Sequence, residues 1–334
     1  MEKNLDIIAE IAQGYMGDYS LCKKFIEAAA KANATSVKFQ LVYADELSTK
    51  DYKYFKLFKS LEIKENKWKL LKLFSKKNNI KLCFDIFGEK SLKLAEKLKV
   101  ETIKIHPTDL TNYSFLKKVS KSKIKNIILG VGGYELKNIQ KALNFFQEKK
   151  IIMMHGFQGY PTLDNENHLN RIDLFKKIFI QDNIKFAFAD HSSPEDNDGH
   201  LASIIAIGKG VSVIEKHLTI SKVLKMEDYE SAYNPDEFFS YVEIIKKAFS
   251  MLGIKFITKN NFKLSVKEKN YFRNISRHYV FKKNIKKNTR LNPDMFHLKR
   301  TSNKKALGAN FDINNKILKK DKKKGHPLFS KEMF

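Results

Sequence analysis

The sequence predicts a (β/α)₈ barrel, or TIM barrel, over the first three quarters of the chain, followed by a small β-rich domain. Apolar, β-rich runs recur about every 25 to 40 residues, amphipathic stretches separate them, and eight such units fit into about 250 residues. This periodicity stops after Gly253, where a lysine-rich connection begins. We therefore expect a barrel over residues 1–254, a linker over 255–276 and the small domain over 277–334.

Each strand and helix of the barrel is expected from a local pattern. The strands are expected at residues 7–12, 37–42, 80–87, 102–106, 126–131, 151–156, 184–190 and 211–218. Helical spacing of apolar residues is clearest at residues 21–31, 92–98, 136–146 and 236–252. An open, doubly wound sheet is the alternative. That fold more often has a glycine-rich phosphate loop after its first strand, and the sequence EIAQG at 10–14 is not one.

The positive charge is concentrated at one end of the chain. Of the net charge of +26, residues 255–334 carry +18, which leaves +8 for the barrel. A strong basic charge raises nucleic acid as a partner, but no helix-turn-helix, zinc knuckle or aromatic-basic strand motif accompanies it. We therefore expect an acidic or phosphorylated substrate, or an acidic partner surface, rather than nucleic acid.

Membrane and secretory signals are missing from the pattern. No apolar run approaches the roughly 20 residues of a membrane helix, and the chain begins without the charged start and apolar stretch of a signal peptide. Cys22 and Cys83 are too few for a disulfide framework or a thiolate metal site. We expect a soluble, cytoplasmic protein with two reduced thiols and no membrane partner.

Polar side chains interrupt nearly every expected strand near its C-terminal end, the end that surrounds the active site in a barrel. They are Glu10, Lys38, Gln40, Asp85, Lys104, His106, His155, Asp190, His191, Glu215 and His217. Because side chains alternate along a strand, residues two positions apart lie on one face. This places Glu215 with His217, Lys38 with Gln40, and Lys104 with His106. Because burying a lone charge is costly, we predict an inward-facing active site; a satisfied polar layer without catalysis is the alternative.

Two histidines indicate a metal site. His191 follows the seventh expected strand, and His217 lies at the end of the eighth. Two neutral imidazoles suit a borderline divalent ion and leave positions open for water and substrate. We expect Mn²⁺, with Zn²⁺, Fe²⁺ and Mg²⁺ as alternatives.

Several short motifs follow one another along the barrel: IIAEI at 7–11, VKFQ at 37–40, IKI at 103–105 with DLTNY at 109–113, His155 with YPT at 160–162, DHS at 190–192 and VIEKH at 213–217. In these motifs and their order, the chain resembles the N-acetylneuraminate (sialic acid) synthase family. The tail, with LKR at 298–300 and KKKGHPL at 322–328, resembles that family's antifreeze-like (SAF) domain.

The resemblance implies a reaction: phosphoenolpyruvate condenses with an N-acylated amino sugar in its aldehyde form, giving a nonulosonic acid for surface glycans. It places Glu10 as the carboxylate that orients or deprotonates the attacking water, with Glu215 and Lys38 as further catalytic candidates. Lys38 and Lys104 would hold the anionic donor. By position, the resemblance also implies sugar contacts by Gln40, Tyr160 and Asp228, and by Arg300 from the neighbouring subunit of a domain-swapped homodimer.

The sequence departs from the family pattern mainly at positions where the resemblance implies contacts with the donor's phosphate. The hydroxyl residues expected near the third, fourth and seventh strands are replaced by Asp85, His106 and Ala189. His106 and His155 are candidates to compensate, and Asp190 completes the substrate-binding candidates. The alternatives are a different donor, a weakened member acting as a sugar-binding or assembly subunit, and another metal-dependent aldolase or lyase on the same barrel.

Overall fold

The computed structural model describes residues 4–195, 199–253, 262–303 and 305–334. The chain divides into two compact units, Met1–Phe256 and Ile257–Phe334. The expected end of the barrel at residue 254 lies outside the described residues.

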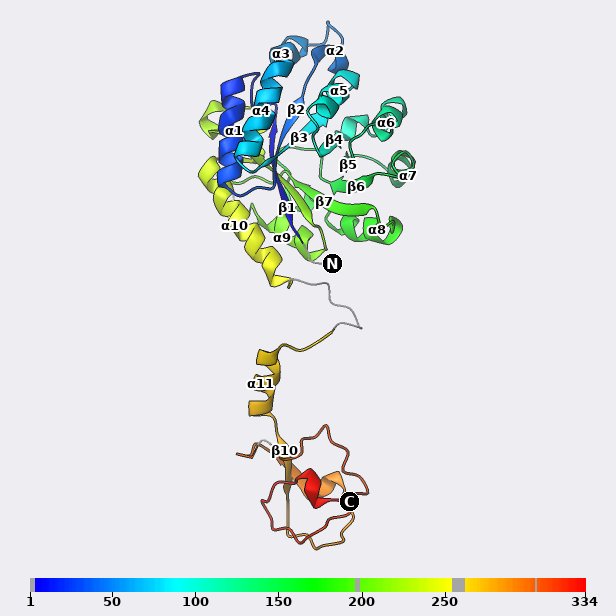
Figure 1. Cartoon of the computed structure of the whole chain (residues 1–334), viewed down its shortest axis with the longest axis vertical. Helices are drawn as coiled ribbons and strands as arrows, with labels where there is room; N and C mark the ends of the chain where they lie inside the picture. The colour runs from blue at the N-terminus through cyan, green and yellow to red at the C-terminus, as the bar shows by residue number, and fades with distance from the viewer. Residues whose placement is uncertain (1–3, 196–198, 254–261, 304) are drawn as a thin grey trace. The chain divides into compact units, whose positions relative to one another are not determined.

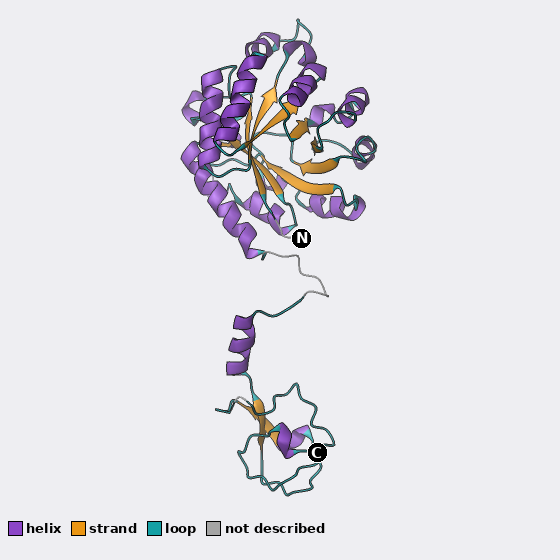
Figure 2. Cartoon of the chain, in the orientation of Figure 1, coloured by secondary structure: helices purple, strands orange, loops and turns teal. Residues whose placement is uncertain are grey.

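Eight parallel strands form a closed barrel in the first unit (Figures 1 and 2). They are β1 (Asp6–Ala12), β2 (Ser36–Leu41), β3 (Lys81–Ile86), β4 (Thr102–Ile105), β5 (Asn126–Gly130), β6 (Lys150–His155), β7 (Ile184–Asp190) and β8 (Val213–Leu218). The sheet closes because β1 pairs with both β2 and β8. The predicted (β/α)₈ barrel is confirmed, and every expected strand overlaps an observed one. A short strand, β9 (Ala232–Tyr233), also pairs with β8.

Helices surround the barrel on its outside (Figure 1). They are α1 (Tyr19–Lys31), α2 (Ala44–Leu47), α3 (Phe55–Ser60), α4 (Glu65–Lys77), α5 (Glu89–Lys97), α6 (Tyr113–Ser120), α7 (Leu136–Leu143), α8 (Asn170–Ile178), α9 (Leu201–Gly208) and α10 (Pro235–Met251). Their starts follow ordinary capping chemistry. The Asp18 carboxylate accepts from two backbone N–H groups of α1, and Asn234 and Glu237 form a capping box at α10.

Two apolar layers hold the barrel together. The outer layer lies between strands and helices, where Trp68 of α4 packs edge-on against Tyr15, Phe39 and Phe84. The inner layer fills the barrel with small and aliphatic side chains: Ile8, Cys83, Ile128, Met154, Ala187, Ala189 and Val213. Further toward the C-terminal ends of the strands, several inward positions are polar. The apolar layer therefore forms a base on which the polar residues of the site rest.

The second unit has a small core of its own. Helix α11 (Val266–Ile275) precedes β10 (His278–Phe281), which pairs antiparallel with β11 (Phe296–Lys299). Phe281, Phe296 and neighbouring apolar residues form its core. Helix α11 lies within the segment that was expected to be a linker. The SAF assignment of this unit stays a prediction. None of the described helices is long and apolar enough to cross a membrane.

Candidate active site

The C-terminal ends of the barrel strands surround a cavity of about 400 Å³, including its open mouth. Its lining includes nine of the predicted site residues: Glu10, Gln40, Lys104, His106, Tyr160, His191, Glu215, His217 and Asp228. Asp85 also lines it, whereas Lys38, His155 and Asp190 do not. Arg300 belongs to the second unit, where its Nε donates a hydrogen bond to the carbonyl of Ile275 at 3.1 Å.

Lys38 is the centre of a buried ion network. Its side chain has no exposed surface, and its Nζ lies 2.8 Å from Asp85 Oδ2 and 3.2 Å from Glu215 Oε2. It also forms an ion pair with Glu10. Burial favours the neutral amine, but the three carboxylates outweigh it and raise the pKa of Lys38 well above its ordinary value. Lys38 is therefore a fixed cation that gathers three carboxylates around it.

An irregularity in β1 positions Glu10. The pairing of β1 with β2 shifts register between Glu10 and Ala12, and Ala12 has a left-handed φ of 49°. The backbone N–H of Ala12 thereby turns to donate to Glu10 Oε1 at 2.6 Å. Burial raises the pKa of Glu10 to about 8; the neighbouring Lys38 opposes this shift, and Glu215 adds to it. A raised pKa near the working pH is typical of a general acid or base.

Glu215 stays charged beside two lysines. Its Oε1 accepts a hydrogen bond from Lys104 Nζ at 2.5 Å. Burial alone would raise the pKa of Glu215, but Lys104 and Lys38 outweigh burial and lower it to about 2. Glu10 and Glu215 therefore have pKa values displaced in opposite directions, which suits an acid–base pair.

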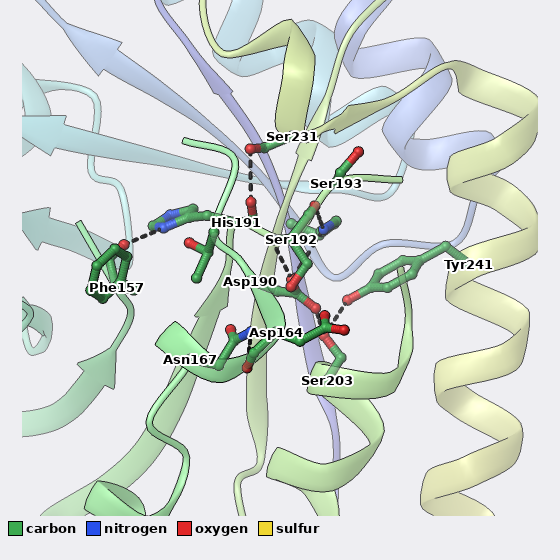
Figure 3. Close-up of polar contacts among 12 residues, drawn as sticks. Phe157, Asp164, Asn167, Asp190, His191, Ser192, Ser193, Ser203, Ser231 and Tyr241 are labelled. Atoms are coloured by element: carbon green, nitrogen blue, oxygen red, sulfur yellow. Dashed lines mark hydrogen bonds and ion pairs between the residues drawn. The ribbon is translucent and has the colours of Figure 1, made fainter. Parts of the chain in front are cut away.

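His191 and His217 both line the cavity and are buried, with ring centroids 5.5 Å apart. The Nδ1 of His191 donates to the carbonyl of Phe157 at 2.7 Å, as Figure 3 shows. This bond fixes the tautomer and leaves Nε2 as a free lone pair. Burial lowers the pKa of His191 to about 4 and that of His217 well below its ordinary value. Both rings are therefore neutral at pH 7.

This pair fits a divalent metal ion with open coordination positions. Neutral imidazoles are metal ligands, and a second-shell hydrogen bond like that from His191 to Phe157 orients such ligands. Asp228 lies nearby, with Oδ2 3.8 Å from His217 Nδ1. Within the described part of the chain, no group of three or more His, Cys, Asp and Glu side chains is arranged to hold an ion. With His191 and His217 as its protein ligands, such an ion would take its remaining ligands from water and substrate.

Tyr160 and Asp228 border the histidine pair. The Tyr160 ring lies 4.4 Å from the His191 ring and 5.8 Å from the His217 ring, measured between centroids. Burial and two neighbouring glutamates raise the pKa of Asp228 to about 7. Gln40 also lines the cavity, and its side-chain oxygen accepts a hydrogen bond from Gln13 Nε2 at 2.9 Å. The cavity therefore combines hydrogen-bonding groups with buried ions.

Comparison with known proteins agrees with this geometry. A profile of the NeuB family matches residues 25–256, more than half of the chain. The chain belongs to the NeuB family. The N,N'-diacetyllegionaminic acid synthase of Campylobacter jejuni is 32% identical over 309 residues, which cover 86% of this chain and 87% of that protein. A pseudaminic acid synthase of the same species is 27% identical, and the match covers 75% of this chain and 76% of that protein.

Solved structures show the same relationship. The crystal structure of the sialic acid synthetase from Leptospira borgpetersenii, in complex with citrate, superposes with a TM-score of 0.71 at 27% identity. The match covers 81% of this chain and 92% of that one. The resemblance noted in the sequence is thus confirmed at the level of family and fold.

Asp190 points away from the cavity of this NeuB-family barrel. Its carboxylate accepts hydrogen bonds from Ser203 Oγ at 2.5 Å and from the backbone of Ser192 at 3.0 Å, and it pairs with Lys216 at 3.1 Å. Ser203 in turn bonds Tyr241 of α10 (Figure 3). The role that this geometry supports is structural: Asp190 ties the end of β7 to α9 and α10, and so fixes the backbone on which His191 stands.

His155 also lies outside the cavity, because its neighbour Met154 occupies the inward position of β6. The His155 ring packs against Phe175 of α8 and Phe188 of β7, and its Nε2 bonds the carbonyl of Asn167 at 2.9 Å. Burial lowers the pKa of His155 below its ordinary value, against the effect of this hydrogen bond. The geometry supports packing rather than substrate binding.

We predict that His155 makes stability depend on pH. A histidine with a depressed folded-state pKa contributes stability that is complete above its unfolded pKa of about 6.5 and is lost as the pH falls through the folded value. The free energy of unfolding should therefore decline between pH 7 and pH 5, and His155→Phe should decline less steeply. Urea titrations at several pH values measure this. A changed substrate KM with an unchanged slope would instead place His155 in the site.

Sequence reasoning missed some contributors to the site. The Phe157 carbonyl orients His191, yet a backbone acceptor leaves no mark in the sequence. Gln158 lines the cavity from the same loop. Gln13, which holds Gln40, could have been found as a polar residue directly after the first strand.

Proposed function

We propose that this protein condenses phosphoenolpyruvate with an N-acylated amino sugar, giving a nonulosonic acid and phosphate for surface glycan synthesis. A carbon–carbon bond would form between the donor's methylene carbon and the sugar aldehyde, water would add to the donor's central carbon, and phosphate would leave. The observation that carries the proposal is the cavity itself, in which two neutral histidines stand beside oppositely shifted carboxylates in a NeuB-family barrel.

The residues of the cavity have matching roles in this reaction. His191 and His217 would hold a divalent ion, with Mn²⁺ preferred, and that ion would supply Lewis-acid polarisation of the sugar aldehyde. Glu10, with its raised pKa, would orient the attacking water and take its proton. Lys104 and His106 also line the cavity and are further candidates for contact with the donor. The relatives named for legionaminic, pseudaminic and sialic acids support an acylated amino sugar as the acceptor.

The test is phosphate release. We expect the chain with Mn²⁺ to release one phosphate per nonulosonic acid formed when it is mixed with phosphoenolpyruvate and an N-acetylated amino hexose, and none when either substrate is omitted. Condensation of pyruvate without phosphate release would favour an aldolase. Sugar binding without turnover of any donor would favour the weakened family member.

We further propose that the active assembly is a homodimer in which Arg300 of one copy completes the cavity of the other. Its support is the basic charge of the second unit together with the family position of Arg300. Mixing inactive His217→Ala and Arg300→Ala chains should regenerate activity, because one site of each mixed dimer combines an intact barrel with an intact tail. Mixed dimers that stay inactive would exclude an Arg300 contribution in trans.

A further inference from the structure

Asp85 presents an unsatisfied oxygen to the cavity. This residue of β3 is 1% exposed and lines the cavity. Its Oδ2 is held by Lys38 at 2.8 Å, whereas its buried Oδ1 has no hydrogen-bond partner in the described structure. A buried polar atom without a partner is costly, and such atoms in native sites commonly await a ligand or water. When the carboxylate is ionised, Asp85 Oδ1 can accept a hydrogen bond but cannot donate one.

The lysines near Asp85 are not free to bind an anion. Lys38 is shared among Glu10, Asp85 and Glu215, and it does not line the cavity. Lys104, which pairs with Asp85 in the register of β3 and β4, is bonded to Glu215. A phosphate or carboxylate placed against β3 would therefore meet a negative oxygen whose neighbouring cations are already neutralised. In a buried site, where the dielectric constant is low, this oxygen would repel a bound anion strongly.

The neighbours of Asp85 instead suit a hydroxyl group. In the register of the sheet, Asp85 stands beside Gln40 of β2, whose amide also borders the cavity. The Gln40 oxygen accepts from Gln13, so its nitrogen remains to donate. This wall thus offers an acceptor on Asp85 and a donor on Gln40, which together match a hydroxyl that both gives and receives a hydrogen bond.

We infer that Asp85 is a specificity-determining residue that binds a hydroxyl of the acceptor sugar and excludes anionic groups from the β3 wall. The inference rests on the proposed function for the identity of the sugar. Exclusion of anions follows from the geometry alone and can be measured without turnover. The anionic donor would accordingly bind away from Asp85, on the side of the cavity that carries the histidine pair.

Asp85→Asn tests this inference because it replaces one carboxylate oxygen, a hydrogen-bond acceptor, with an amide NH₂ group, a donor. Lys38 requires an oxygen, so the asparagine carbonyl should stay on Lys38 and the amide N–H₂ should face the cavity. An acceptor becomes a donor with almost no change in shape. We expect inorganic phosphate to bind the Mn²⁺-loaded full chain at least tenfold more tightly than it binds the wild type. The affinity for N-acetylated amino hexoses should fall about 10- to 100-fold, as expected for loss of a hydrogen bond to a charged group.

Asp182→Asn is the matched control, because it removes the same charge from an exposed residue at the opposite end of the barrel. It should change neither affinity. If Asp85→Asn does not fold, Asp85→Ser keeps the test open, since its hydroxyl can donate to phosphate. Equal phosphate affinity in wild type and a folded Asp85 variant would overturn the inference. Absence of phosphate release by the wild type would count against the proposed function alone, because the phosphate titration needs no reaction.

Discussion

His217→Ala should abolish both bound metal and activity. His217 is one of two neutral imidazoles that line the cavity, and the other ligand, His191, cannot hold an ion alone. Metal analysis after loading with Mn²⁺ should find about one ion per wild-type chain and a small fraction of that in the variant. Because Lewis-acid stabilisation is worth several kcal/mol, kcat should fall about 10³-fold or more. His191→Ala should behave in the same way.

His155→Gln is the control for this experiment, since it alters a buried histidine outside the cavity. It should keep the wild-type metal content. Circular dichroism of each variant would show whether loss of metal follows from loss of the fold. If folded His217→Ala retains its Mn²⁺ and its rate, the metal does not sit on this pair.

The barrel could be predicted from the sequence because its signal is repeated eight times. A single apolar run such as that of β5 is ambiguous between strand and buried helix, but regular alternation with amphipathic segments removes the ambiguity. The second unit has no such repeated pattern of strands and helices. Helix α11 has no buried residue, and its start was marked only by the capping box of Ser265 and Glu268, which the lysine-rich composition around it obscured.

Within the site, the sequence succeeded where alternation along a strand identified the inward face. Glu215 and His217 are two positions apart on β8, and both line the cavity. It failed at His155 and Asp190, the last residues of β6 and β7, which face the surrounding helices instead. Strands of a parallel barrel are buried on both faces, so a polar residue at a strand end does not reveal its direction. The direction of such a side chain is decided by partners distant in the sequence, such as Ser203, which donates a hydrogen bond to Asp190.

Lys38 is the residue whose predicted role changes most. The resemblance noted in the sequence implies that Lys38 holds the anionic donor. The structure instead surrounds Lys38 with the carboxylates of Glu10, Asp85 and Glu215, away from the cavity wall. Removing one partner of a buried ion network leaves the others uncompensated. We therefore expect Lys38→Ala to lower the free energy of unfolding by about 3 to 5 kcal/mol.

The pH dependence of this loss of stability would show whether it comes from the carboxylates left without a cation. In the variant, the carboxylates around position 38 have lost a shared cation, so their folded-state pKa values should rise, that of Glu10 beyond its wild-type value of about 8, and the variant should gain more stability than the wild type as the pH falls. In the wild type, the pKa of Glu215 is about 2, and its contribution is lost as the pH falls toward that value. The stability difference between the two proteins should accordingly shrink from pH 8 to pH 5 in urea titrations. Lys104→Ala, which removes a cation from the cavity wall with only one carboxylate partner, should cost less stability and show a weaker dependence on pH. A Lys38→Ala protein as stable as the wild type, with weakened donor binding alone, would restore the role expected from the sequence.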